Sequence, residues 1–162
     1  MILVYERPWW RDSGLCGLTQ SCHGPFAVTR DTSVEDQGHY SLTCFVVGQP
    51  ARDWYKLSAA ERRKSVMDHV QKLFGPFAEV EEPIEVVEQI WRHEQWSQGC
   101  PCPILEPGGL TKFEHVLRAP AGRLHFVGTE TAFEWKGYME GAVRSGERGA
   151  KEVLLSLNKA KL

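Results

Sequence analysis

A carboxylate that follows a short apolar run is the first feature of this sequence that could do chemistry. Glu130 stands in the run Gly128-Thr129-Glu130-Thr131, directly after a segment that predicts a buried strand through Leu124, Phe126 and Val127. In open α/β sheets, ligands bind beyond the carboxyl ends of the strands. A carboxylate at that edge can accept hydrogen bonds from ribose or ribityl hydroxyls.

A helix rich in glycine is predicted after this run, from about Gly137 to Leu157. The free N–H groups and the positive dipole end of its first turn suit a phosphate or the electron-rich edge of a ring. Gly141, Gly146 and Gly149 each weaken the helix by about 1 kcal/mol relative to alanine. Either a cofactor or another backbone approaches them closely, or they allow tight packing on a sheet, and their spacing leaves both interpretations open.

The cysteines and histidines form no pattern that is typical of catalysis. An odd number of cysteines, five, favours free thiols in a reducing compartment. Cys16, Cys22 with His23, and Cys100 with Cys102 could gather around one zinc ion, although the sequence has no C-x-x-C pair. A small zinc-clipped domain is therefore kept as a minor alternative. No metal ligand is assigned, and no histidine is assigned to catalysis.

Composition narrows the function classes. With 19 Lys and Arg against 21 Asp and Glu, the net charge of −2 provides no basic field for nucleic acid. A hydrophobic fraction of 42% is enough to build a core. No apolar stretch of about 18 residues occurs, so we expect no transmembrane segment. The ending Ala160-Lys161-Leu162 is similar to the S-K-L address, which predicts a peroxisomal location, with a cytoplasmic one as the alternative.

The first half of the chain reads as strands. Alternating and β-branched runs bounded by Gly, Pro and Asp predict strands at 1–5, 25–30 and 40–48, with a polar loop or hairpin connection over 31–39. A further strand is predicted at 83–91. After it, residues 92–109 are predicted to form a long irregular connection, and connections of this length are usually functional.

Capping boxes predict two helices. Ser58 and Glu61 start the clearer one, which carries an apolar stripe and ends at Gly75-Pro76. Its basic residues are predicted to face solvent: Arg62, Arg63 and Lys64. Thr111 and Glu114 form a second box, which predicts a short helix through Leu117.

The segment HFVGTETAFEWKGYMEGAVRSGERGA, residues 125–150, resembles the C-terminal flavin-binding segment of the flavin-containing monoamine oxidases. The resemblance continues upstream through 81–120, which looks like the stretch that carries the family's S-G-G-C motif and its following P-G-x-L-T. YERPWWR at 5–11 and CFVVGQPARDWYKLSAAERRK at 44–64 look like parts of the family's substrate domain. The resemblance covers nearly the whole chain, and GTET with W-x-G-Y-M-E-G-A is its most specific part.

The resemblance implies the contacts to the cofactor. Glu130 matches the family acid that contacts the sugar-like portion of FAD, with Gly128 and Thr129 beside it. Met139 matches the residue whose backbone N–H approaches the flavin pyrimidine edge. Tyr138 matches one wall of the aromatic pair that flanks the substrate amine.

Three further positions follow from the same resemblance. Cys100 aligns with the cysteine that links covalently to the flavin in the animal enzymes, but other relatives bind flavin without this bond, and the covalent link is not favoured here. Pro101 stands where the second aromatic wall is expected, which puts substrate preference in doubt. Phe45 matches an apolar strand residue near the substrate cavity, and a plain core phenylalanine is the alternative.

Two parts of the family pattern have no counterpart in the sequence. The G-x-G-x-x-G loop that cradles the pyrophosphate is absent, and the family lysine that reaches flavin N5 through water would align before Met1. The chain is therefore expected to be an α+β fragment. Residues 1–95 would be part of an antiparallel-sheet substrate domain, and residues 96–162 the C-terminal strand–helix piece of a doubly wound FAD-binding domain. We expect such a fragment to be marginally stable without its partner sheet.

The implied activity is the oxidative deamination of a small amine by FAD and oxygen, giving an aldehyde and hydrogen peroxide. Its partner would be the missing N-terminal portion of the enzyme, and the isolated chain is expected to be inactive. The main alternative is a non-catalytic remnant or partner-binding fragment. Neither the amine nor the oligomeric state follows from the sequence.

Overall fold

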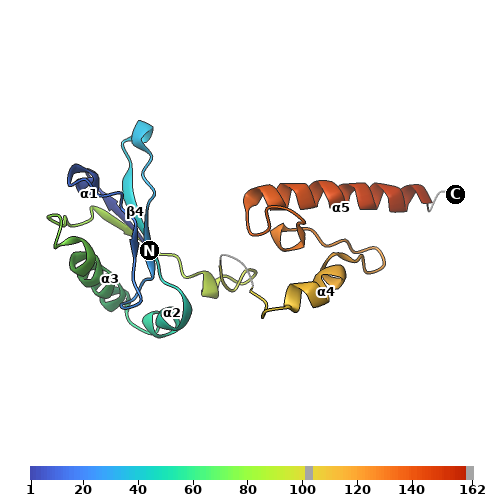
Figure 1. The fold of residues 1–162 in the computed structure, drawn as a ribbon, viewed down its shortest axis with the longest axis horizontal. Coiled ribbons are helices and arrows are strands. Elements are labelled where there is room, and N and C mark those ends of the chain that lie inside the picture. The colour runs from blue at the N-terminus through green and yellow to red at the C-terminus, as the bar shows by residue number, and fades with distance from the viewer. Residues whose placement is uncertain (101–103, 160–162) are drawn as a thin grey trace. The chain divides into compact units, whose positions relative to one another are not determined.

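The computed structural model describes residues 1–100 and 104–159. It divides into two compact units, residues 1–90 and the residues from 91 onward (Figure 1). Of the predicted positions, Pro101, Cys102 and Ala160-Lys161-Leu162 lie outside the described residues.

The first unit is built on a five-stranded antiparallel sheet with the strand order β2-β3-β4-β1-β5. Its strands are β1 (Ile2–Tyr5), β2 (Thr19–Gln20), β3 (Val28–Asp31), β4 (Tyr40–Phe45) and β5 (Glu85–Val87). The predicted hairpin connection over 31–39 is confirmed, and it contains the short 3-10 helix η1 (Glu35–Gln37). The strand predicted at 83–91 is only three residues long.

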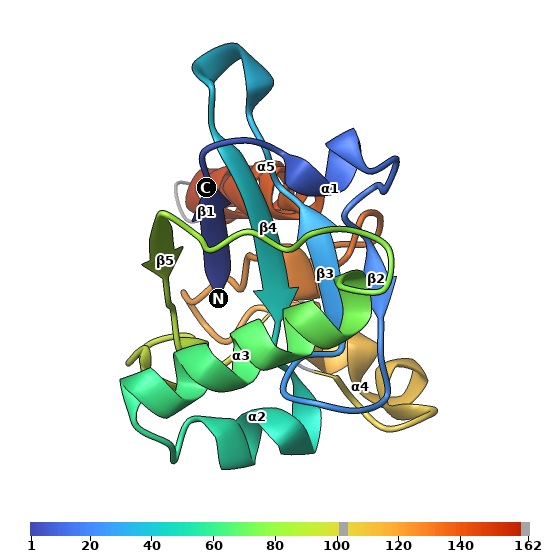
Figure 2. The ribbon, with the colours of Figure 1, turned by 90° about the vertical axis from the view of Figure 1, so that its left-hand side faces the viewer.

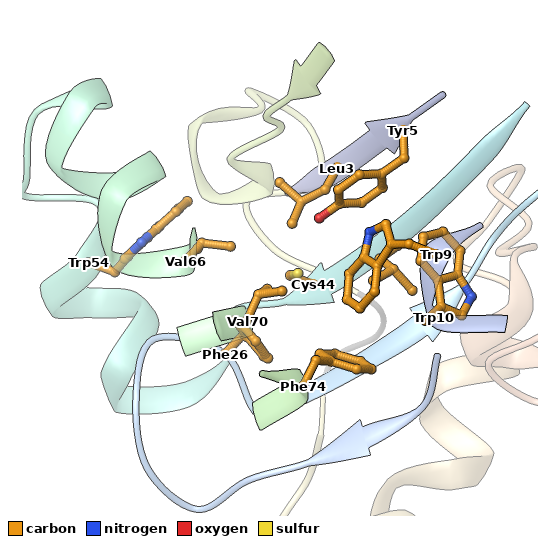
Figure 3. Packing of buried hydrophobic residues seen from close by; sticks show 11 residues of the cluster. Leu3, Tyr5, Trp9, Trp10, Phe26, Cys44, Trp54, Val66, Val70 and Phe74 are labelled. Atoms are coloured by element: carbon orange, nitrogen blue, oxygen red, sulfur yellow. The ribbon is translucent and has the colours of Figure 1, made fainter. Parts of the chain in front are cut away.

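Three helices accompany this sheet: α1 (Trp9–Asp12), α2 (Gly48–Trp54) and α3 (Ala59–Phe74). Figure 2 shows α3 crossing one face of the sheet. Val66, Val70 and Phe74 of α3 are buried in one cluster with the strand residues Leu3 and Cys44 (Figure 3). Leu42 of β4 belongs to the same cluster. The first-turn box of α3 is present, with Ser58 Oγ accepting from Glu61 N at 3.3 Å and Glu61 Oε2 accepting from Ser58 N at 2.8 Å.

Aromatic side chains fill most of this core. The Tyr5, Trp9 and Trp10 rings meet edge to face at centroid distances of 5.4–5.7 Å, and Trp9 meets Phe74 at 5.4 Å. Large rings bury much apolar area each, so a small sheet with one main covering helix can still form a core. Burial raises the pKa of the Tyr5 hydroxyl above its ordinary value, which keeps this core phenol protonated.

Asp31 joins α1 to the β3–β4 hairpin. Its carboxylate accepts from Trp10 Nε1 at 2.8 Å, from Arg11 Nε at 2.6 Å and from Ser33 N at 3.0 Å. Burial by itself raises the pKa of Asp31, but the hydrogen bonds from Arg11, Ser33 and Trp10 outweigh it and hold the pKa well below its usual range. The carboxylate is therefore a structural anion.

Two expectations for the first unit need correction. Arg62 does not face solvent. It pairs with Glu88, with Nη2 to Oε1 at 2.6 Å, and its guanidinium lies 5.5 Å from the Trp54 ring centroid, because its long stem can cover apolar surface. The continuation of the strand to residue 48 is also wrong. The chain turns at Gly48, with φ 67°, and enters α2.

The second unit is helical among its described residues. It contains the 3-10 helices η2 (Trp91–His93) and η3 (Thr129–Thr131) and the helices α4 (Gly109–Arg118) and α5 (Met139–Lys159). The long helix was predicted from about Gly137 and begins two residues later. Residues 94–108 contain no helix or strand where they are described, in agreement with the predicted irregular connection.

The strand predicted through Leu124, Phe126 and Val127 is wrong for this chain. The segment forms only an isolated bridge between Ala121 and Leu124, and all three apolar side chains are about half exposed or more. A strand needs a neighbour that accepts and donates its backbone hydrogen bonds, and the described residues of this unit provide no neighbouring strand. The predicted burial fails for the same reason.

The second capping box is also wrong. Helix α4 begins at Gly109, after Gly108 in a left-handed conformation with φ 84°, so Thr111 lies inside the first turn. Glu114 instead pairs with Arg118 at 2.5 Å, one turn further along the helix. The two adjacent glycines allow a tight entry that the box pattern alone did not predict.

Candidate flavin-contacting half-site

The predicted cofactor residues gather around a turn formed by residues 128–131, which we call the GTET turn. Gly128 has φ 135°, a conformation that suits glycine, and an added Cβ would lie 3.1 Å from Glu130 Oε2. Thr131 N and Thr131 Oγ1 both donate to the Gly128 carbonyl, at 3.0 and 2.9 Å. The turn therefore closes on itself and leaves Glu130 exposed.

The Thr129 hydroxyl connects the GTET turn to the start of α5. It accepts from Gly137 N at 2.7 Å and donates to the Tyr138 carbonyl at 2.9 Å. One side chain thus brings together two segments that lie eight to nine residues apart in the sequence. Sequence reasoning placed Thr129 beside the cofactor but did not predict this connecting role.

Tyr138 and Met139 are presented on the surface at the end of this connection, 65% and 88% exposed. The Tyr138 ring meets Trp135 edge to face at 6.0 Å. Met139 is the first residue of α5, so its N–H has no acceptor within the helix. The arrangement offers an exposed carboxylate, an exposed aromatic ring and a helix N-terminus. These are the groups to which the sequence resemblance assigns contacts with the cofactor and the amine.

The glycines of α5 have different surroundings. A Cβ at Gly141 would overlap the Trp135 carbonyl, and one at Gly149 would overlap a methyl group of Val127. Packing within this unit therefore accounts for these two. An added Cβ at Gly146 would meet nothing within 4 Å, so the packing of the described residues does not require this glycine.

The remaining predicted positions lie elsewhere. Cys100 is exposed in the connection before α4. Phe45 is at the end of β4 in the first unit and 45% exposed, so it is not a plain core phenylalanine. The alternation along β4 places it on the opposite sheet face from buried Cys44, whose thiol pKa burial raises to about 12. Within the described residues, no three metal-binding side chains gather as a zinc site would require.

One cavity of about 200 Å³ opens in the second unit. None of the predicted site residues lines it; the lining residues are Ala132, Phe133, Glu134, Arg144, Ser145 and Arg148. Of the helices in the described part of the chain, none is long and apolar enough to cross a bilayer.

Comparison with known proteins identifies the family. The model for flavin containing amine oxidoreductases matches residues 1–154, almost the whole chain. The chain belongs to this family. The matched range includes residues 125–150, whose resemblance to flavin-containing monoamine oxidases is thereby explained.

Named relatives agree with this assignment. The chain is 39% identical over 160 residues to flavin-containing amine oxidase B of Sus scrofa, and 38% identical over 161 residues to a probable flavin-containing monoamine oxidase A of Dictyostelium discoideum. These matches cover 98% and 99% of this chain but 31% and 35% of the relatives. The chain therefore spans about a third of their length.

Solved structures give the same relation. Cyclohexylamine oxidase from Brevibacterium oxydans IH-35A superposes with a TM-score of 0.85 at 30% identity, over 97% of this chain and 34% of that one. A putrescine oxidase bound to putrescine superposes with a TM-score of 0.84 at 30% identity, over 95% of this chain and 34% of that one. The predicted α+β fold is thus confirmed, and it matches about a third of these solved amine oxidases.

Proposed function

We propose that this chain is the C-terminal part of a FAD-dependent amine oxidase, which converts a small amine to an aldehyde with release of hydrogen peroxide. The observation that carries the proposal is the Thr129 connection, which presents Glu130, Tyr138 and Met139 from two segments at once. Family membership supports flavin as the cofactor. The 162 residues alone are proposed to be inactive, since the chain spans about a third of its relatives.

Glu130 would hold the sugar-like portion of the cofactor. Its exposed carboxylate can accept two hydroxyl hydrogen bonds, and Gly128 beside it leaves room for close approach of the ligand. Thr129 would orient the neighbouring backbone. No loop for the pyrophosphate exists in the sequence, so that group must be bound by the N-terminal portion of the enzyme.

Met139 and Tyr138 would face the ring and the amine. The Met139 N–H, at the positive end of α5, would stabilise negative charge that builds up on the nearby ring edge. The Tyr138 ring would form one apolar wall beside the amine. When bound, the flavin supplies the chemistry, because it takes two electrons from the amine and passes them to oxygen.

The remaining proposed contacts to the amine and the flavin involve Phe45, Pro101 and Cys100. Phe45 would line the amine cavity from the substrate domain, and Pro101 would replace the second aromatic wall. We propose that the flavin is held without a covalent bond to Cys100. Acid precipitation would then release all of the flavin into the supernatant.

A chimera tests this function. In it, this chain replaces the matched segment of the Dictyostelium relative, and flavin content and peroxide formation are measured with a monoamine, putrescine and cyclohexylamine. Glu130→Ala should reduce flavin retention, whereas Glu134→Ala, which removes an exposed partner of Arg144, should not. Equal loss in both variants would contradict the role of Glu130. Flavin binding without peroxide from any amine would favour the non-catalytic remnant.

We also propose that the ending Ala160-Lys161-Leu162 directs the protein to peroxisomes. Its similarity to the S-K-L address supports this, and a peroxide-producing enzyme suits that compartment. A fluorescent protein carrying these last residues should accumulate in peroxisomes, and a diffuse cytoplasmic signal would refute the proposal.

A further inference from the structure

The backbone of the GTET turn is held by side chains from two helices. Gly128 N donates to Ser145 Oγ of α5 at 2.8 Å, and Ser145 is 2% exposed. The Ser145 hydroxyl in turn donates to the Ala142 carbonyl at 2.8 Å. The first amide of the turn is thus fixed to α5 without any contribution from a sheet.

Arg148, one turn further along α5, reaches the chain on both sides of Gly128. Its Nη2 donates to the Phe126 carbonyl at 2.8 Å and to Thr131 Oγ1 at 3.0 Å. Its Nη1 donates to Glu152 at 2.5 Å, and Glu152 also contacts His125 Nδ1 at 3.1 Å. A planar guanidinium can make these contacts together, but an ammonium group cannot reproduce their geometry.

Arg118 fixes the far end of the turn from α4. Its Nε donates to the Thr131 carbonyl at 2.8 Å and its Nη2 to the Ala132 carbonyl at 3.2 Å. Its side chain is 12% exposed, and the guanidinium lies 3.8 Å from the centroid of the Phe133 ring. Charge-assisted hydrogen bonds with little exposure to water are among the stronger contacts of a small unit.

We propose that Arg148 and Arg118 are positioning residues that hold the GTET turn in its ligand-ready shape within this chain by itself. Within residues 123–128, which lack a neighbouring strand, the Arg148 guanidinium donates to the Phe126 carbonyl. Beyond this segment, Arg118 donates to the carbonyls of Thr131 and Ala132. The identity of the ligand rests on the proposed function, but the preformed turn does not. A flavin then meets a turn that needs no ordering on binding, which lowers the entropic cost.

Arg144 provides a matched control. It lies on α5 one turn before Arg148 and pairs with Glu140 at 2.7 Å and with Glu134, at 48% exposure. Within the described residues, its hydrogen-bond partners are carboxylates, whereas those of Arg148 include Thr131 of the turn. Replacing either arginine by lysine keeps the charge and the helix propensity nearly constant.

Amide hydrogen exchange by NMR on the whole 162-residue chain tests the proposal. In Arg148→Lys, the Gly128 and Thr131 amides should exchange about tenfold faster than in the parent chain, since an ammonium group cannot keep the hydrogen bonds to Phe126 and Thr131 together. In Arg144→Lys they should be unchanged, and Arg118→Lys should accelerate Thr131 and Ala132. In the same sample, slow hydrogen exchange of the β4 amides shows that the first unit is folded.

Two results would overturn the proposal. One is equal protection in Arg148→Lys and the parent chain, which would mean that pairing with Glu152 is all that Arg148 provides. The other is a parent chain without protection at Gly128 and Thr131. Flavin retention is measured separately, in the chimera. If exchange is faster in Arg148→Lys but the chimera binds no flavin, the proposed function is refuted and the proposal of a preformed turn stands.

Discussion

At the scale of single residues, buried or half-buried charged side chains connect segments that are far apart in the sequence. Asp31 accepts from Trp10, Arg11 and Ser33 in the first unit, and Arg148 donates to Phe126 and Thr131 in the second. Each of these groups has several partners, so removing one group leaves several others unsatisfied. Their identities were not predicted from the sequence, because such partners lie 2 to 22 residues apart with no fixed spacing.

Asp31→Asn should destabilise the first unit at neutral pH by about 1.5–3 kcal/mol, the usual range for a hydrogen bond to a charged group. Because the folded pKa is depressed, the stability that Asp31 contributes is complete above its unfolded pKa of about 4 and is lost as pH falls through the folded value. The difference in the free energy of unfolding between the parent chain and Asp31→Asn should therefore become smaller at acidic pH. Urea unfolding followed by tryptophan fluorescence at several pH values measures it.

Asp12→Asn is the control for this prediction. Asp12 pairs with Arg7 at 2.8 Å, but both side chains are more than half exposed, and exposed pairs contribute only about 0–1 kcal/mol. If Asp12→Asn and Asp31→Asn lost equal stability with the same pH dependence, the structural role of Asp31 would be refuted.

At the scale of elements, the sequence correctly predicted the helices and strands that depend on local sequence signals. The capping box at Ser58 and Glu61 and the apolar stripe behind it were enough for α3, and the alternation in 40–45 was enough for β4. The strand at 123–128 could not be predicted correctly for this chain, because an apolar run becomes a strand only beside another strand. Helix α2 was missed because Gly48 and Pro50 look like loop residues.

Substitutions of the α5 glycines distinguish the two explanations that the sequence left open, tight packing and close approach of a cofactor or another backbone. Gly146→Ala should strengthen the helix by about 0.5–1 kcal/mol, since the methyl group enters open space. Gly141→Ala should weaken it, because the methyl group would meet the Trp135 carbonyl, which cannot move away as a flexible side chain can. Far-UV circular dichroism during urea unfolding of the whole chain measures the difference. Equal effects of the two substitutions on the free energy of unfolding would contradict the different surroundings described for Gly141 and Gly146.

The substitution Gly146→Ala can also be tested in the chimera. If Gly146→Ala lowers flavin retention there, close approach of a cofactor or another backbone explains this glycine. If retention is unchanged, Gly146 has no role in cofactor binding.

At the scale of the whole molecule, the two units differ in what they bury. The first has an aromatic core with Trp9, Trp10 and Phe26 almost fully buried. In the second, apolar residues of the 123–128 segment and of α5 are exposed, including Leu124, Leu154 and Leu155 at 61–66%. The second unit therefore exposes apolar surface, and we propose that the N-terminal portion of an amine oxidase covers it.

We propose that the GTET turn and the start of α5 form half of a flavin site. The most direct measurement is an FAD titration of the isolated chain and of the chimera, followed by flavin absorbance and by gel filtration. The chimera should retain one FAD per chain, and the isolated chain should retain none. Stoichiometric retention of FAD by the isolated chain, or its absence from a folded chimera, would contradict the account.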